Sequence, residues 1–256
     1  MSPKISTSHA VFLPGLIALS LCGLLHAAEV SVAAAANFAA PMKLLLERFE
    51  QETGHRTRLS VGATGTLYAQ IRGGAPFDVF LAADSDTPAR LEQENIGVAG
   101  SRFSYATGRL VLWSARAGTV DASAEVLKNG NFKHLAMAEP KLAPYGAAAV
   151  QTLTQLGLLE RLRPRLVLGQ SLGQTYSFVA TGNAELGFVA LSQVSENGTI
   201  RPGSIWIVPA NLHKPLRQDA VLLLRANHNP AAKALLTFLK TDKSKTVIRS
   251  FGYETE

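Results

Sequence analysis

Two hydrophobic patterns alternate along the chain from residue 29 onward. Short apolar runs, VSVAAAAN, RTRLSVG and FDVFLAAD, have the length and residue types of buried strands. Between and after them, segments such as 41–52 (PMKLLLERFEQE) and 146–159 (GAAAVQTLTQLGLL) repeat apolar residues at helical spacing. Strands that alternate with amphipathic helices are typical of mostly parallel sheets. We therefore predict an α/β fold with helices flanking the sheets.

Two long extended stretches divide this alternation into sections. SYATGRLVLWSA at 104–115 and QDAVLLLRA at 218–226 flank a middle section that repeats the strand and helix pattern. This arrangement predicts two lobes joined by two crossover strands, with 29–106 and 219–256 in lobe I and 107–218 in lobe II. A cleft between such lobes can close on a ligand by hinge motion.

Residues 1–28 have the pattern of an export signal. A basic residue precedes an apolar run at 11–25, and LHAA offers small residues for cleavage. A membrane anchor is the alternative, but a spanning helix needs about 20 apolar residues, whereas this run is shorter and contains Pro14. We predict cleavage after Ala27 or Ala28 and a periplasmic mature protein.

The single cysteine, Cys22, lies inside the predicted signal. The bulky Leu21 precedes it, where lipoprotein signals usually have a small residue, so we expect no lipid anchor. The predicted mature chain then has no cysteine. Disulfides, thiolate metal sites and cysteine nucleophiles are excluded from it.

The charge of the chain is moderately basic. The 25 basic and 19 acidic residues give a formal net charge of +6. The basic residues are dispersed, and their densest group, RLRPR at 161–165, has no interleaved aromatic residues. We expect no nucleic-acid partner. A basic surface that attracts anions is the better interpretation.

Four segments place small or hydroxyl-bearing residues directly ahead of a predicted helix: AAAANFAAPM, VGATGTLYAQI, EPKLAPYGAAA and GQSLGQTYSF. A helix start offers unpaired N–H groups and the positive end of the helix dipole. Several starts that converge on one cleft make a binding site for a small anion. This pattern predicts anion capture.

Individual residues in these segments have two interpretations each. Asn37 and Thr64 can cap their helices, since both residue types do so often, or they can donate to a bound oxygen. Tyr145 can donate one hydrogen bond into the cleft or pack its ring against the hinge. Leu172 has an apolar side chain and can offer only its backbone N–H.

The histidines of the predicted mature chain do not indicate an enzyme. None of them falls in a recognisable G-x-S-x-G, H-E-x-x-H or paired-carboxylate setting, and the phosphate-binding pattern G-x-x-x-x-G-K-[ST] is absent. Four histidines fall in predicted loops or turns: His55, His134, His213 and His228. We therefore predict no catalytic activity, no cofactor and no direct metal ligands.

These segments together resemble the periplasmic molybdate-binding components of bacterial ABC transporters. The most specific stretch is VGATGTLYAQIRGGAPFDVFLAAD, and GSRFSYATGRLVLW and ELGFVALSQV also match in place. The resemblance runs from about Val30 to Tyr253. It implies a two-lobed periplasmic binding protein fold (type II), a monomer, and an inner-membrane ABC permease that receives the ligand.

The resemblance also implies a ligand and its contacts. Molybdate or tungstate would be held as an oxyanion, without direct metal ligands, by Ala36, Asn37, Thr64, Tyr145 and Leu172. Ala36 stands where relatives often have Ser or Thr, so one hydroxyl is missing unless Asn37 replaces it. Ala190 stands where some relatives have a cleft tyrosine, and Tyr145 can supply that phenol instead.

Neutral donors suit an unprotonated dianion. Each hydrogen bond to a charged acceptor contributes about 1.5–3 kcal/mol, whereas a protonated anion such as hydrogen phosphate brings a hydrogen where an acceptor is wanted. Molybdate, tungstate and sulfate are unprotonated at neutral pH, so the size of the cavity must distinguish sulfate from the larger molybdate and tungstate. The alternatives are a binding protein for sulfate or an organic acid, or an exported enzyme. An organic carboxylate would call for an arginine fork; none sits in these segments, although Arg72 and Arg109 are not far away in sequence.

Overall fold

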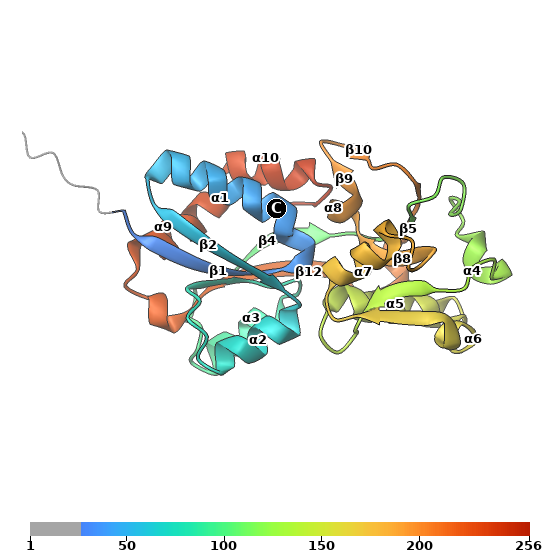
Figure 1. The fold of residues 1–256 in the computed structure, drawn as a ribbon. Coiled ribbons are helices and arrows are strands. Elements are labelled where there is room, and N and C mark those ends of the chain that lie inside the picture. The colour runs from blue at the N-terminus through green and yellow to red at the C-terminus, as the bar shows by residue number, and fades with distance from the viewer. Residues whose placement is uncertain (1–26) are drawn as a thin grey trace, which may run out of the picture.

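The computed structural model describes residues 27–256 and shows two lobes, each built on a five-stranded sheet (Figure 1). The predicted export signal lies outside the described residues except for its last two positions, Ala27 and Ala28. Within 27–256, none of the helices has both the length and the apolar character needed to cross a membrane. The predicted two-lobed α/β architecture is confirmed.

The sheet of the first lobe has the strand order β2-β1-β3-β12-β4. Its strands are β1 (Glu29–Ala35), β2 (Arg56–Gly62), β3 (Val79–Leu81), β4 (Phe103–Gly108) and β12 (Leu216–Leu222). β1 pairs in parallel with β2 and β3, and β12 runs antiparallel to β3 and β4. The returning strand β12 is the last of these strands in sequence, but it lies inside the sheet, between β3 and β4.

Helices cover both faces of this sheet. They are α1 (Ala39–Thr53), α2 (Thr64–Arg72), α3 (Asp86–Gln93), α9 (Pro230–Leu239) and α10 (Asp242–Ser250). Successive strand residues point to opposite faces, so Val32 of β1 packs in the cluster that contains α1, α9 and α10, while Ala33 packs with Leu67 of α2. Figure 1 shows α1 and α10 on one side of the strands and α2 and α3 on the other.

The sheet of the second lobe has the order β11-β5-β8-β6-β7. Its strands are β5 (Leu110–Ser114), β6 (Leu135–Ala138), β7 (Leu166–Gly169), β8 (Leu186–Ala190) and β11 (Ser204–Ile207). β6 is parallel to β7 and β8, and β5 is antiparallel to β8 and β11. A short ribbon of β9 (Ser195–Glu196) and β10 (Thr199–Ile200) lies outside this sheet.

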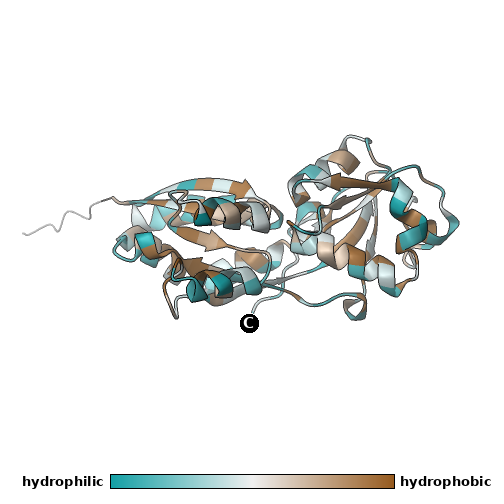
Figure 2. Cartoon of the chain, turned by 90° about the horizontal axis from the view of Figure 1, so that it is seen from below, coloured by the Kyte–Doolittle hydropathy of each residue, from teal (hydrophilic) through white to brown (hydrophobic). Residues whose placement is uncertain are grey.

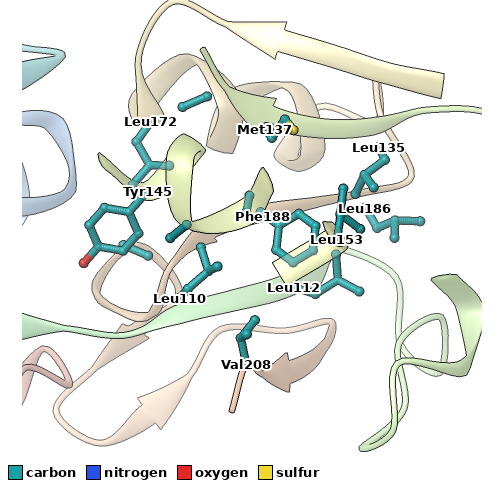
Figure 3. Close-up of a cluster of buried hydrophobic side chains, with 14 of the residues drawn as sticks. Leu110, Leu112, Leu135, Met137, Tyr145, Leu153, Leu172, Leu186, Phe188 and Val208 are labelled. Atoms are coloured by element: carbon teal, nitrogen blue, oxygen red, sulfur yellow. The ribbon is translucent and has the colours of Figure 1, made fainter. Parts of the chain in front are cut away.

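The helices of the second lobe are α4 (Glu125–Asn129), α5 (Pro144–Gln155), α6 (Leu159–Leu162), α7 (Leu172–Ala180) and α8 (Leu191–Val194). Leu153 of α5 packs against Leu112 and Phe188 of the sheet in one buried cluster (Figure 3). Val179 of α7 belongs to a second cluster. Figure 2 shows apolar strands enclosed by helices that also carry hydrophilic residues.

Two crossover segments join the lobes. β4 leads through Arg109 into β5, and residues 208–215 lead from β11 back to β12. The register of β12 against β4 shifts between Gln218 and Asp219, which pair with Ala106 and Ser104, so the extra residue of this β-bulge is Tyr105 of β4. Single turns of 3-10 helix lie at η1 (Ala36–Phe38), η2 (Arg163–Arg165), η3 (Ala210–Leu212) and η4 (Leu224–Ala226).

Candidate functional site

All five predicted site residues lie at the starts of helices, and all are buried. η1 begins at Ala36, α2 at Thr64 and α7 at Leu172. Tyr145 is the second residue of α5, and Asn37 is the second residue of η1. The exposed fraction of each is at most 8%. As first residues of α-helices, Thr64 and Leu172 present N–H groups that have no acceptor within the helix.

Packing brings the five residues together between the lobes. Ala36 of the first lobe shares one buried cluster with Tyr145 and Leu172 of the second. Ala83 belongs to the same cluster, and its N–H donates to the Thr64 hydroxyl at 3.0 Å. Figure 3 shows Tyr145 beside Leu172 at one end of this cluster, with the phenol oxygen directed away from the core of the second lobe.

The Thr64 hydroxyl is oriented by the Ala83 N–H. The N-cap position of α2 is Ala63, and no side chain caps this helix, so the interpretation of Thr64 as a cap is wrong. Its oxygen accepts from Ala83, and a hydroxyl carries one hydrogen of its own. That hydrogen remains available for a further acceptor.

The side chain of Asn37 is held inside the protein. Its Nδ2 donates to Gln218 Oε1 at 2.8 Å and to the Tyr253 hydroxyl at 2.9 Å. An amide nitrogen has two hydrogens, so both are used. Capping is also wrong for Asn37, because neither η1 nor α1 has a side-chain cap. The side chain therefore cannot replace the hydroxyl that Ala36 lacks, and only the backbone N–H of Asn37 is left for a ligand.

Asn37 belongs to a buried set of hydrogen-bonded residues that the sequence reasoning missed. We call this set the tyrosine network; it comprises Asn37, Tyr105, Tyr145, Ser192, Gln218 and Tyr253. The hydroxyls of Tyr253 and Ser192 each lie 2.8 Å from the Asn37 carbonyl oxygen. Gln218 Nε2 donates to the Tyr145 hydroxyl at 3.1 Å. Gln218 lies between Arg217 and Asp219 in the crossover strand, so no local pattern in the sequence singled it out.

The three phenols of the tyrosine network stay protonated. Burial is the main cause that raises the pKa of Tyr105 and Tyr145 well above the usual value of 10.0, and it raises the pKa of Tyr253 as well. Nearby Tyr253 raises the pKa of Tyr145 further. Each hydroxyl therefore remains a neutral donor at physiological pH.

None of the five site residues carries charge, and the arginines near the segments in sequence form no fork at the site. Arg72 lies at the end of α2, pairs with Glu94 at 3.5 Å and has a side chain that is 53% exposed. Arg109 lines a separate cavity beside the crossover segments, together with His213. Ala190 is fully buried in the same cluster as Tyr145. The donors that these five residues can offer are therefore backbone N–H groups at helix starts and hydroxyl groups.

A cleft of about 640 Å³ opens beside the site. It is lined by Ala36 and Asn37 from the first lobe and by Ser171 and Gly173 from the second, with Lys43 also on its wall. It borders the site on the side of η1 and does not reach Thr64 or Tyr145. Within 27–256, no group of three or more His, Cys, Asp or Glu side chains is placed to hold a metal ion.

Comparisons with known proteins agree with this architecture. The sequence profile described as bacterial extracellular solute-binding protein matches residues 30–254. The chain is 58% identical to the molybdate-binding protein ModA of Azotobacter vinelandii over 228 residues, which cover 89% of this chain and 90% of that protein. The chain belongs to the ModA family of bacterial extracellular solute-binding proteins.

Further members of the ModA family match over similar lengths. The ModA protein of Rhodobacter capsulatus is 49% identical over 231 residues, with 90% of each chain covered. A solved structure of the periplasmic molybdate-binding protein of Azotobacter vinelandii has a TM-score of 0.87 and 40% identity, and the match covers 89% of this chain and 99% of that one. The fold is therefore the two-lobed type II fold of periplasmic binding proteins, as the resemblance implied.

Proposed function

We propose that this member of the ModA family captures molybdate, and also tungstate, between its lobes and delivers the oxyanion to an inner-membrane ABC permease. The observation that carries the proposal is the meeting of helix starts η1, α2, α5 and α7 in one buried place with neutral donors only. The 58% identity to a protein named molybdate-binding supports the choice of ligand.

In this proposal, two kinds of donor hold the oxyanion. Backbone N–H groups come from Ala36, Asn37 and Leu172, and hydroxyls come from Thr64 and Tyr145. Each such bond contributes about 1.5–3 kcal/mol. Several together can offset desolvation and lobe closure and leave the roughly 8–12 kcal/mol of micromolar to nanomolar binding. The metal centre is held through its oxygens, and no cofactor or catalytic step is involved.

The proposal includes the organisation and location of the mature protein. Lobe I comprises 29–106 and 219–256, lobe II comprises 107–218, and both boundaries fall within the crossover strands β4 and β12. Cleavage after Ala27 or Ala28 releases a monomer into the periplasm. The extracellular location of the family supports this part of the proposal.

Calorimetric titration of the ligand-free mature protein tests the proposal. Molybdate, tungstate, sulfate and phosphate are added separately at neutral pH. We expect tight binding of molybdate and tungstate, far weaker binding of sulfate, and the weakest binding of phosphate, because hydrogen phosphate meets only donors. Sulfate binding as tight as molybdate binding, or no binding of any oxyanion, would overturn the proposal.

A further inference from the structure

Gln218 occupies an unusual position for a glutamine. It lies in the crossover strand β12 where the register against β4 shifts, opposite a β-bulge at Tyr105 of β4, and it is completely buried. Bulges are common beside functional sites, where they redirect a side chain. A buried amide is costly unless its polar atoms are bonded. Here both ends of the amide have partners, so the side chain is built into the site.

The partners of Gln218 fix the orientation of its amide. Asn37 Nδ2 donates to Oε1 at 2.8 Å. The Tyr105 hydroxyl lies 2.9 Å from Oε1 and 2.9 Å from the Ala82 carbonyl, and its one hydrogen serves one of the two. Half a turn of the Gln218 amide would set its NH2 group against the NH2 group of Asn37. The nitrogen end of Gln218 is therefore the end that faces Tyr145.

Asn37 is oriented in turn by Tyr253. The Tyr253 hydroxyl gives its one hydrogen either to the Asn37 carbonyl at 2.8 Å or to Ser192 Oγ at 2.9 Å. In both cases the Tyr253 oxygen accepts from Asn37 Nδ2 at 2.9 Å. The orientation of the Asn37 amide thus follows from Tyr253, and the orientation of the Gln218 amide follows from Asn37.

This order has a consequence for the Tyr145 hydroxyl. Its oxygen accepts from Gln218 Nε2 at 3.1 Å, so its own hydrogen must point elsewhere. Tyr253 is one neighbour that can receive it, but the Tyr253 oxygen already accepts from Asn37. An ionised ligand oxygen is a stronger acceptor than a phenol. In the presence of an oxyanion, Tyr145 donates to the ligand.

We propose that Gln218 is a positioning residue that makes Tyr145 a donor to the oxyanion and so selects fully deprotonated anions. The role rests on the proposed function, because it requires an oxyanion at Tyr145. Gln218 also connects the lobes: Asn37 and Tyr105 come from the first lobe, and Tyr145 comes from the second. One side chain in a crossover strand therefore accepts a hydrogen bond from Asn37 of the first lobe and donates one to Tyr145 of the second.

A double-mutant cycle separates this role from a structural one. The variants are Gln218→Met, which keeps the length without hydrogen bonds, Tyr145→Phe, and the two combined. We expect each single variant to weaken molybdate binding about 10- to 150-fold, the effect of one lost charged hydrogen bond. The combined variant should be no weaker than Tyr145→Phe alone, because both act through one hydroxyl. Additive losses would overturn the proposal.

Selectivity provides a readout that a structural defect would not move. In Gln218→Met the Tyr145 oxygen loses its donor and becomes free to accept from hydrogen phosphate. We expect the ratio of molybdate affinity to phosphate affinity to fall at least tenfold. Equal weakening of both anions would overturn the proposal. Gln70→Met is the matched control, because Gln70 is exposed on α2, and it should leave both affinities unchanged.

Folding and the proposed function are controlled separately. Circular dichroism and the thermal midpoint verify that each variant is folded. If Gln218→Met does not fold, Gln218→Asn replaces it, since the shorter amide withdraws its nitrogen from Tyr145, and the same outcomes apply. Tight molybdate binding by the unsubstituted protein with an unaffected Gln218 variant would overturn this role alone. No oxyanion binding by the unsubstituted protein would overturn both proposals.

Discussion

The backbone N–H of Gly65 donates to the carbonyl of Leu142 at 2.9 Å. This bond joins the start of α2 in the first lobe to the segment just ahead of α5 in the second. A Cβ atom at Gly65 would lie 3.2 Å from both the Cα and the carbonyl oxygen of Leu142. Such distances are tighter than ordinary van der Waals contacts. The lobes therefore meet at a residue that has no side chain.

Gly65→Ala should weaken molybdate binding without weakening the fold. The methyl group pushes Leu142 away and hinders closure, and overpacking of this kind costs about 1–3 kcal/mol. Alanine is a better helix former than glycine, so the thermal midpoint should not fall. Gly73→Ala is the control, because Gly73 is exposed at the far end of the same helix and a Cβ there has no neighbour nearer than 3.4 Å. Calorimetry and thermal unfolding measure both effects, and equal affinities for the two variants would contradict the prediction.

Thr64→Ala should lower both affinity and stability. It removes one donor to the oxyanion, and it leaves the buried N–H of Ala83 without its acceptor. The lost bond to a charged ligand costs about 1.5–3 kcal/mol, and the unpaired N–H costs about 1–3 kcal/mol of stability. The neighbouring exposed Thr66 provides the comparison, since Thr66→Ala should change neither quantity. Titration and chemical unfolding of both variants decide the outcome.

Gly108→Ala should disrupt the site from the crossover strand. A Cβ at this position would collide with the Tyr145 hydroxyl and with Gln218 Nε2. We expect a loss of about 1–3 kcal/mol in the free energy of unfolding and weaker molybdate binding, because both partners must move. Exposed Gly118 has nothing within 4 Å, but its φ of 72° makes alanine strained, so it is a poor control. Gly73→Ala again serves as the control, and unchanged binding by Gly108→Ala would speak against the described packing.

Molybdate binding should not change as the pH rises from 7 toward 10. The pKa of Tyr145 is raised well above 10.0, chiefly by burial, so its donor hydrogen is present throughout this range. Stability behaves differently at higher pH. The tyrosines of the unfolded chain ionise near their usual pKa, while the three buried tyrosines of the folded chain do not. The contribution of these three groups to the free energy of unfolding is therefore complete below pH 10 and is lost as the pH rises beyond it. Titrations at several pH values test this, and a loss of binding with a midpoint below 10 would refute it.

The fold could be predicted largely from local patterns. Strand and helix periodicity placed the alternation in both lobes, and the two long extended stretches became β4 with β5 and β12. The small and hydroxyl-bearing segments lie at helix starts, since short polar residues and glycine leave a helix terminus open. Short elements such as the β9 and β10 ribbon had no such signal, because two-residue strands carry no period.

The partners of the site residues could not be predicted in the same way. Asn37 bonds to Gln218 and Tyr253, which are 181 and 216 positions away. No local pattern connects residues at such distances, so the sequence left open whether its amide faced a ligand. The surroundings of Gln218 depend on the register of β12 against β4, which only the assembled sheet sets.

The strand order of the first lobe determines when the cleft can form. β12 lies between β3 and β4, although the chain reaches it only after the last strand of the second lobe, β11. The second lobe is continuous in sequence and can complete its sheet while β3 and β4 still have unpaired edges. Gln218 enters the sheet with β12 and brings Asn37 and Tyr145 into register. The hydrogen bonds of Gln218 with Asn37 and Tyr145 therefore require that the chain has already passed through the whole of the second lobe.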